Sequence, residues 1–550
     1  MGMYSDVMSS RKILVAAASF ALLALTALPS EAVYSAERSW WPKVPSIGFS
    51  STEAFTPGVR ETSWITGYSY AEGATSGLYT RTVSCSSVDD AACANADSIA
   101  ANFILPPCAS NEGELCVDSL QISNAAGTLE PATLGYEVPS AKFVASKSRG
   151  TPFGGGISLW RSKSTLNALG VDQFAVHVHL DLQNMRNKAC LSDVKSCSFE
   201  LGNFSANVFP VKVGAASPSE QCLWREKSDC AVITDFLPGT RVALTLRIDN
   251  SLTGFLFGRM QNVSMEVTPI SKTLNSLRVE ANPIDVPSIH AFVAKNDLSK
   301  YPDILKYWNQ RRSNLAAEDL ASNQTIDVGP WPQYAMEDFL AFNAVVQSGE
   351  LASSIWRFGS GLGMGSGSDC YKDKTKILGL VTTNASTYDP APPSFDGSSL
   401  NFRVGGAHFL ADGTTLVKGS YDLALRTEFA RCLYKFSNAP LGASISVVSS
   451  DGSTQDVATE SLREDAAREW LYLSAKNFTF SSPTIRVKLV QKTQVDSTAK
   501  PAANSPSSAP SASAQSPKKT PNITITCVKG KTIKKVTSVN PKCPTGYKKQ

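Results

Sequence analysis

The stretch QFAVHVHLDLQ at residues 173–183 sets the expectation for the whole chain, because its apolar residues recur at every second position. One face carries five apolar side chains, those of Phe174, Val176, Val178, Leu180 and Leu182. The side chains between them fall on the other face, because successive residues of a β-strand point to opposite sides. The stretch is typical of a β-strand with one face in a core.

The same period of two recurs along the chain. It is clearest in TRVALTLRID (240–249), SLNFRVGGAHFL (399–410), TTLVKGSYDLALRTEFARCLY (414–434), ASISVVSS (443–450) and PTIRVKLVQ (483–491). Asp-Gly pairs begin at Asp396, Asp412 and Asp451, and Asp-Gly between alternating segments is a hairpin signal. Closely spaced strands and tight turns predict a mainly β protein with two antiparallel β-sandwich-like domains.

Helical spacing is scarce and is clearest in one short region. YPDILKYWNQRR (301–312) and PQYAMEDFLAFNAVVQSG (332–349) place apolar residues three or four positions apart. We interpret this region as a helical connection. The expected organisation is a signal peptide at 1–32, a disulfide-rich β domain at 33–295, the connection at 296–324, a second β domain at 325–491, a linker at 492–521 and a small module at 522–550.

The N-terminus has the pattern of a secretory signal peptide. Arg11 and Lys12 precede an apolar segment at residues 13–28, and small residues follow at Ser30 and Ala32. The segment is short for a membrane span, which needs about 20 apolar residues. We expect cleavage after residue 32 and a secreted protein; a retained signal anchor is the alternative.

The chain has twelve cysteines, an even number that suggests disulfides. Disulfides are consistent with export, since thiols oxidise outside the cytoplasm. The sequence has no C-x-x-C pair of the kind that structural zinc sites use. The connectivity is not determined by the sequence. We predict that sequence neighbours pair: Cys85 with Cys93, Cys108 with Cys116, Cys190 with Cys197, Cys222 with Cys230, Cys370 with Cys432, and Cys527 with Cys543.

Residues 492–521 are mostly Ser, Ala, Pro and Lys, a composition that cannot bury enough surface to fold and predicts a disordered tether. Residues 492–550 contain eleven lysines and one aspartate, a net charge of +10. Because the whole chain carries +4, the part before residue 492 carries about −6. Positive charge is therefore concentrated at the C-terminal end.

The last thirty residues are too few for a hydrophobic core, so we expect a β-hairpin stapled by Cys527 and Cys543. TITCVKG (524–530) and KTIKKVTSV (531–539) are the predicted strands. A basic hairpin on a tether can bind an anionic envelope polymer, a glycan or anionic lipid heads. The surface-binding candidates are Lys529, Lys531, Lys534, Lys535, Lys542, Lys548 and Lys549. A solubilising basic tail is the alternative, and the lack of interleaved aromatics or arginines argues against nucleic acid.

This segment, TCVKGKTIKKVT…PKCPTGYKK (526–549), resembles a short C-terminal module found on otherwise unrelated secreted actinobacterial proteins. The resemblance implies surface retention or sorting and covers about 28 residues, from Ile523 to Lys549 and its flank. The block from Gly419 to Leu489 is similar to the last domain of uncharacterised secreted actinobacterial proteins, which implies a domain end near Leu489.

The polar face of residues 173–183 carries the best chemical candidate. His177, His179 and Asp181 alternate, so a strand would place them on one face, where two imidazoles can bind zinc. The pattern resembles the H-x-H-x-D-H motif of metallo-β-lactamase-like hydrolases, but Leu182 stands where that motif has its last histidine. A solvent-facing polar row on an antiparallel strand is the other interpretation.

Two functions remain open. The sequence has no G-x-S-x-G and no H-E-x-x-H, and apart from zinc at the candidate above we expect no cofactor. The first hypothesis is a secreted, cell-envelope-associated, non-catalytic protein for adhesion, glycan binding or envelope structure. The alternative is an extracellular hydrolase that uses zinc at the H-x-H-x-D strand.

Overall fold

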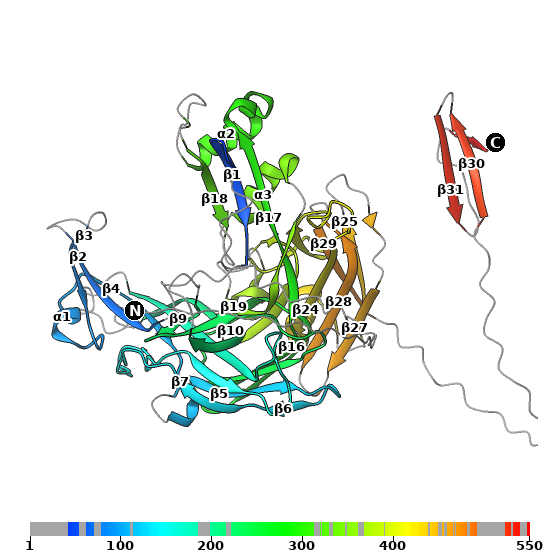
Figure 1. Cartoon of the computed structure of the whole chain (residues 1–550). Helices are drawn as coiled ribbons and strands as arrows, with labels where there is room; N and C mark the ends of the chain where they lie inside the picture. Colours follow the sequence, from blue (N-terminus) through cyan, green and yellow to red (C-terminus); the bar gives the residue numbers. More distant parts are fainter. Residues whose placement is uncertain are drawn as a thin grey trace, which may run out of the picture. The chain divides into compact units, whose positions relative to one another are not determined.

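The computed structural model confirms a mainly β protein (Figure 1). It describes residues 42–491 except for 54–61, 71–78, 111–113, 185–198, 216–221, 313–319, 321, 329–333, 347–348, 361–367, 374, 390, 438–440, 449–453, 456–458, 466, 468 and 481–483, together with 523–529, 532–538 and 547–549 of the C-terminal segment. The predicted signal peptide and the predicted linker lie outside the described residues. The chain divides into two compact units, residues 1–494 and 495–550.

The first unit is organised around a large main sheet. Its strands follow one another in the order β4 (Ser98–Ile104), β9 (Gln173–Asn184), β10 (Glu200–Ala215), β19 (Glu350–Ser360), β14 (Gly254–Arg259), β20 (Ile377–Thr383), β24 (Lys418–Arg426), β28 (Trp470–Thr479) and β27 (Thr459–Asp465). All of these pairs are antiparallel except β14 with β20, which is parallel. The predicted strand at 173–183 thus lies between β4 and β10.

The main sheet combines the two ranges that we expected to form separate β domains, 33–295 and 325–491. Strand β10 pairs with β19, and β14 lies between β19 and β20. The predicted boundary therefore does not interrupt the sheet. Alternation reports which face of a strand is buried but not which strand lies beside it, so this difference was not visible in the sequence pattern.

Each face of the main sheet packs against a further sheet. One is five-stranded: β15 (Gln261–Pro269), β16 (Leu274–Asn282), β13 (Val242–Asp249), β5 (Cys116–Ser123) and β6 (Leu129–Pro131). The other contains β21 (Thr387–Tyr388), β22 (Ser394–Phe395), β23 (Leu400–Gly405), β29 (Thr484–Gln491), β25 (Leu441–Val448) and β26 (Thr454–Gln455). Figure 1 shows β5 below β9 and β10, and β25 and β29 on the opposite side.

Two hydrophobic cores fill these sandwiches. The first packs Val178 and Trp356 of the main sheet against the five-stranded sheet, and the second packs Phe257 and Val381 against the other sheet. The five apolar residues expected on one face of β9 are all buried, four of them in the first core. Burying both sides of a sheet accounts for the sandwich-like architecture.

The predicted helices form a smaller third core. Helices α2 (Pro302–Arg311) and α3 (Ala335–Phe342) pack with strands β1 (Ser46–Ser51), β17 (Ile284–Ala294) and β18 (Gln324–Val328). Trp308 and the phenylalanines of α3 are buried there, and the ring of Phe49 lies 6.3 Å from that of Phe342. Both helices begin and end within the predicted ranges, which confirms the two helices that we predicted from the spacing of apolar residues.

The remaining elements lie at the end of the main sheet near β4 and β9. They are β2 (Trp64–Tyr70), β3 (Tyr79–Ser84), α1 (Ala91–Ala94), β7 (Thr133–Glu137), β8 (Ser158–Arg161), β11 (Arg225–Glu226) and β12 (Asp229–Ile233). The one described helix that we expected as strand is α4 (Thr427–Tyr434), which follows β24 directly. Within the described residues, no helix has the length and apolarity needed to cross a membrane.

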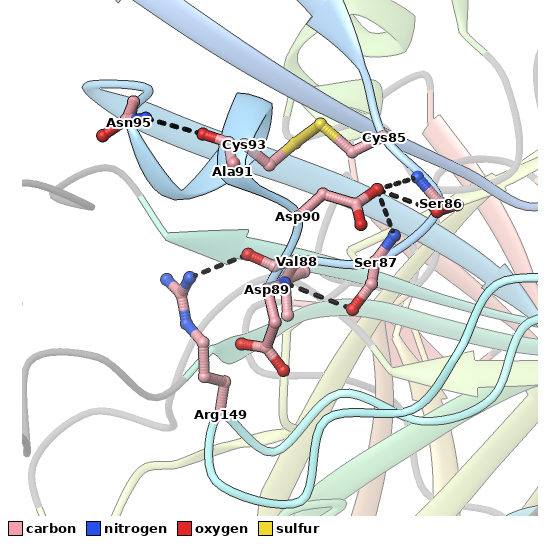
Figure 2. Close-up of a disulfide and its surroundings, with 10 residues drawn as sticks. All are labelled: Cys85, Ser86, Ser87, Val88, Asp89, Asp90, Ala91, Cys93, Asn95 and Arg149. Atoms are coloured by element: carbon pink, nitrogen blue, oxygen red, sulfur yellow. Dashed lines mark hydrogen bonds between the residues drawn. A yellow bond between two sulfur atoms is a disulfide. The ribbon is translucent and has the colours of Figure 1, made fainter.

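Four predicted disulfides are confirmed: Cys85–Cys93, Cys108–Cys116, Cys222–Cys230 and Cys370–Cys432. Figure 2 shows the first of them, where Asp90 accepts hydrogen bonds from the backbone of Ser86 and Ser87 and so closes the loop. The predicted pairs Cys190–Cys197 and Cys527–Cys543 each include residues outside the described part of the chain. Disulfides fit an oxidising compartment.

Candidate functional site

The predicted H-x-H-x-D row lies on the face of β9 opposite the first core. The rings of His177 and His179 stack with their centroids 5.5 Å apart. His179 Nδ1 lies 2.9 Å from Ser205 Oγ on the neighbouring strand β10. Asn207 donates one hydrogen bond to that Oγ at 3.0 Å and another to the His177 carbonyl oxygen at 3.3 Å.

The structure corrects the solvent-facing interpretation of this row. His177 and His179 are only 1% and 2% exposed, and Asp181 is half-buried, with its carboxylate 3.5 Å from Asn203 Nδ2. The face is polar in sequence and yet lies in the interior, because the strand is covered on both sides. Buried polar groups of this kind need hydrogen-bond partners, and β10 supplies one to the His179 side chain through Ser205.

The histidines belong to a longer buried polar row that crosses four adjacent strands. Asn207 of β10 is opposite His177 on one side and opposite Arg357 of β19 on the other. Arg357 is in turn opposite Arg259 of β14. Residues directly opposite in antiparallel strands share a face, so these four side chains form one continuous row. All four are buried.

Glu53, two residues after the end of β1, supplies the countercharge. Its carboxylate accepts a hydrogen bond from Arg259 Nε at 2.8 Å and another from the guanidinium of Arg357. One carboxylate between two guanidiniums leaves this buried triad with a net charge of +1. Removing two cations and an anion from water is costly, and the attraction between them offsets that cost only while all partners are present.

Arg259 is also held by neutral groups. Its guanidinium donates to the carbonyl oxygens of Thr383 and Ser386 and lies 4.4 Å from the ring centroid of Tyr388. Burial lowers the pKa of Arg259 to about 10, so the side chain stays charged at neutral pH. The row therefore connects β1, the main sheet and the segment that enters β21.

The histidine pair is enclosed by the sheet. Ser205 and His179 form a hydrogen-bonded pair, but both are buried in the sheet and neither lines a described pocket. The structure brings the two predicted histidine ligands together. Among the described residues, however, no group of three or more His, Cys, Asp or Glu side chains is placed to hold a metal ion.

Sequence reasoning did not find Glu53, Arg259 or Arg357. The glutamate is 206 positions from one arginine and 304 from the other, so no local spacing connects them. A weak signal was present: each arginine interrupts an apolar strand, in GFLFGRM (254–260) and SIWRFGS (354–360). A lone charge in such a segment indicates either an exposed face or a buried partner, and only tertiary structure distinguishes the two.

The C-terminal unit contains the predicted hairpin. Strand β30 (Ile523–Lys529) pairs antiparallel with β31 (Thr532–Ser538), and β32 (Lys548–Lys549) pairs with β30 on its other edge. The register places Lys534 and Lys549 on either side of Cys527. Five of the seven surface-binding candidates lie on these strands, and Lys531 and Lys542 lie outside the described residues.

The three comparisons with known proteins give no match: no family model, no curated protein and no solved structure resembles the chain. The roles of these residues therefore rest on their geometry and charge.

Proposed function

We propose that this is a secreted, cell-envelope-associated, non-catalytic protein, and that its basic C-terminal module holds it to an anionic polymer or glycan of the envelope. The observation that carries the proposal is the C-terminal hairpin, because five lysines are built into three paired strands of a separate compact unit. A paired backbone keeps those charges at fixed spacing, whereas a solubilising tail needs no fold.

The distribution of charge supports the same function. Residues 492–550 carry +10, while the rest of the chain carries about −6. An anionic surface therefore attracts the C-terminal unit and repels the larger one. The likeness of residues 526–549 to the C-terminal module of secreted actinobacterial proteins led us to the same proposal from the sequence.

Burial of the histidine row supports the non-catalytic part of the proposal. A zinc-dependent hydrolase needs metal ligands that a substrate can reach, whereas His177 and His179 face the interior of the sheet. The four disulfides of the body suit export, where they would stabilise a protein outside the cell.

The retention experiment compares the full chain with a chain that ends at Gln491. We expect the full chain to stay with cells and the shortened chain to be released to the medium, with at least about a tenfold change in the bound fraction. Raising the salt concentration to about 1 M shortens the screening length to about 3 Å and should release the full chain.

A matched pair of variants separates charge from fold. Replacing the seven candidate lysines by glutamine should release the protein, and replacing them by arginine should leave it bound. Equal release of the full and shortened chains would contradict the proposal, and so would retention that is insensitive to salt and to the glutamine variant.

A further inference from the structure

A groove of about 660 Å³ opens at one end of the sandwich between the main sheet and the five-stranded sheet. It lies beside β9 and β10 on one side and beside the end of β13 on the other. Small-molecule sites in proteins are concave and occupy roughly 300–1,000 Å³. The groove falls within that range, and neither the buried polar row nor the C-terminal hairpin contributes to it.

The floor of the groove is apolar and continuous with the first core. It is made by Leu180 and Phe204 of the main sheet and by Ile248 and Leu252 from the β13 side. The walls combine the partly exposed apolar side chains of Leu115, Phe153, Phe199 and Leu201 with polar ones, among them Ser146, Thr151, Ser251 and Thr273. The apolar part of the lining, aliphatic side chains and three phenylalanine rings, suits an elongated hydrocarbon.

The rim of the groove carries charge of both signs. Lys147 pairs with Glu114 at 2.8 Å, and Arg247 pairs with Asp118 at 2.7 Å. Both pairs are exposed to water, the first with 85% and 65% of its side chains accessible. Exposed ion pairs contribute little to stability, so an anionic group that enters the groove can share these cations at small cost.

Two further cations stand over aromatic rings of the wall. The guanidinium of Arg149 lies 5.2 Å from the ring centroid of Phe199, and Lys142 Nζ lies 5.9 Å from that of Phe153. Of the charged side chains that line the groove, two are cations, Lys147 and Arg247, and two are carboxylates, Glu114 and Asp249. Both lining cations are exposed, so an anionic group can reach them.

Arg149 lies over the wall residue Phe199 without itself lining the groove, and the neighbouring disulfide loop holds it there. Its guanidinium donates to the carbonyl oxygen of Val88 at 3.2 Å, inside the loop that Cys85–Cys93 closes (Figure 2). Asp90 fixes the same loop through its hydrogen bonds to Ser86 and Ser87. Arg149 thereby supports the Phe199 wall of the groove, and a pre-organised wall lowers the entropic cost of binding.

We propose that this groove binds an amphiphile of the fatty-acid class, with its aliphatic chain on the apolar floor and its anionic head among the cations of the rim. The chain buries hydrocarbon against residues that already form a core, and the head meets Lys147 and Arg247. The site would allow a protein outside the cell to hold a single lipid. It does not depend on how the C-terminal unit is retained, so either proposal can fail without the other.

The test uses the full mature chain and cis-parinarate, a fluorescent fatty acid. We expect saturable binding of one molecule per chain. Ala145 is an exposed residue of the groove lining, so Ala145→Trp should block the groove without disturbing a core and should weaken binding at least about tenfold. Ala126→Trp, in the exposed turn between β5 and β6 and away from the groove, should bind as the unaltered chain does.

The head group is tested by displacement of the probe. Dodecanoate should displace cis-parinarate more effectively than dodecanol, and Lys147→Glu should remove that preference while Lys147→Arg keeps it. Absence of saturable binding, or equal binding by Ala145→Trp and the unaltered chain, would overturn the proposal. Equal displacement by the acid and the alcohol would overturn the assignment of an anionic head group.

Discussion

At the scale of the residue, Glu53 is the position at which a small change should cost most. Its carboxylate is the shared partner of two buried guanidiniums, those of Arg259 and Arg357. In Glu53→Gln both arginines stay positively charged, but the negative charge that neutralises part of their charge is removed. We expect the free energy of unfolding to fall by about 3–5 kcal/mol, measured by urea denaturation.

The matched control is Glu428→Gln, which removes an ion pair of the same type at the surface. Glu428 lies 2.7 Å from Lys376, and about half of each side chain is exposed. Exposed pairs contribute about 0–1 kcal/mol, so this variant should unfold almost as the unaltered protein does. If the free energy of unfolding fell by a similar amount in both variants, burial would not make the Glu53 ion pairs more important for stability than a surface pair.

Asp412 gives the turn at residues 412–415 a pH dependence. Hydrogen bonds from the side chain of Thr415 and from the backbone of Thr415 and Thr414 hold the pKa of this carboxyl at about 2, below its usual 3.8. A lowered folded-state pKa stabilises the turn above the unfolded value, and that stabilisation is lost as the pH falls from about 4 through 2.

A carboxyl titration followed by NMR checks this expectation. The midpoint of Asp412 should lie near 2 in the unaltered protein and move toward 3.8 in Thr415→Val, which lacks the hydroxyl donor. A midpoint near 3.8 in the unaltered protein would mean that the turn does not hold the ionised form.

At the scale of the element, the confirmed disulfides differ in how much chain they close. Cys370–Cys432 spans 62 positions and joins the segment before β20 to α4, while Cys85–Cys93 spans only 8. The chain-entropy model gives about 4 kcal/mol for the first loop and about 2.5 kcal/mol for the second. Unfolding free energies of the two double Cys→Ala variants should follow this order, and the reverse order would contradict the entropic account.

Helix α4 shows why an element can be misjudged from its sequence. Residues 418–426 alternate and form β24, and we extended that strand into TEFARCLY (427–434). The second segment is a helix whose Phe429, Ala430 and Leu433 face the second core. These three buried residues lie one and four positions apart, which is helical spacing. A segment of eight residues is nevertheless too short for that spacing to be recognised after the alternating pattern of the preceding strand. Lys435, with a left-handed φ of 57°, ends the helix.

At the scale of the whole molecule, the shared main sheet predicts how the body unfolds. Strands from residues 98–259 and 350–479 pair with one another, so neither range keeps its hydrogen bonds when the other is lost. We expect one calorimetric transition for the body, and the same transition temperature in a chain that ends at Gln491. Two separate transitions would instead support independent β domains at 33–295 and 325–491.

The strand-rich character, the two helices near residues 301–349, the hairpin at the C-terminus and four disulfide pairs all followed from the sequence. They depend on residues close together in the chain, where alternation, 3.6-residue spacing and short cysteine separations report local geometry directly. The long Cys370–Cys432 bridge is the exception, because its two cysteines are 62 positions apart and are neighbours only in the order of cysteines along the chain.

The order of strands in the main sheet, the burial of His177 and His179, the Glu53–Arg259–Arg357 triad and the groove were settled by tertiary packing alone. Each depends on segments one hundred or more residues apart, and a strand with a polar face reads the same whether water or a second layer of protein covers it. The physical reason is that alternation encodes two faces of a strand, whereas neighbours and coverings are chosen by the free energy of the complete sheet.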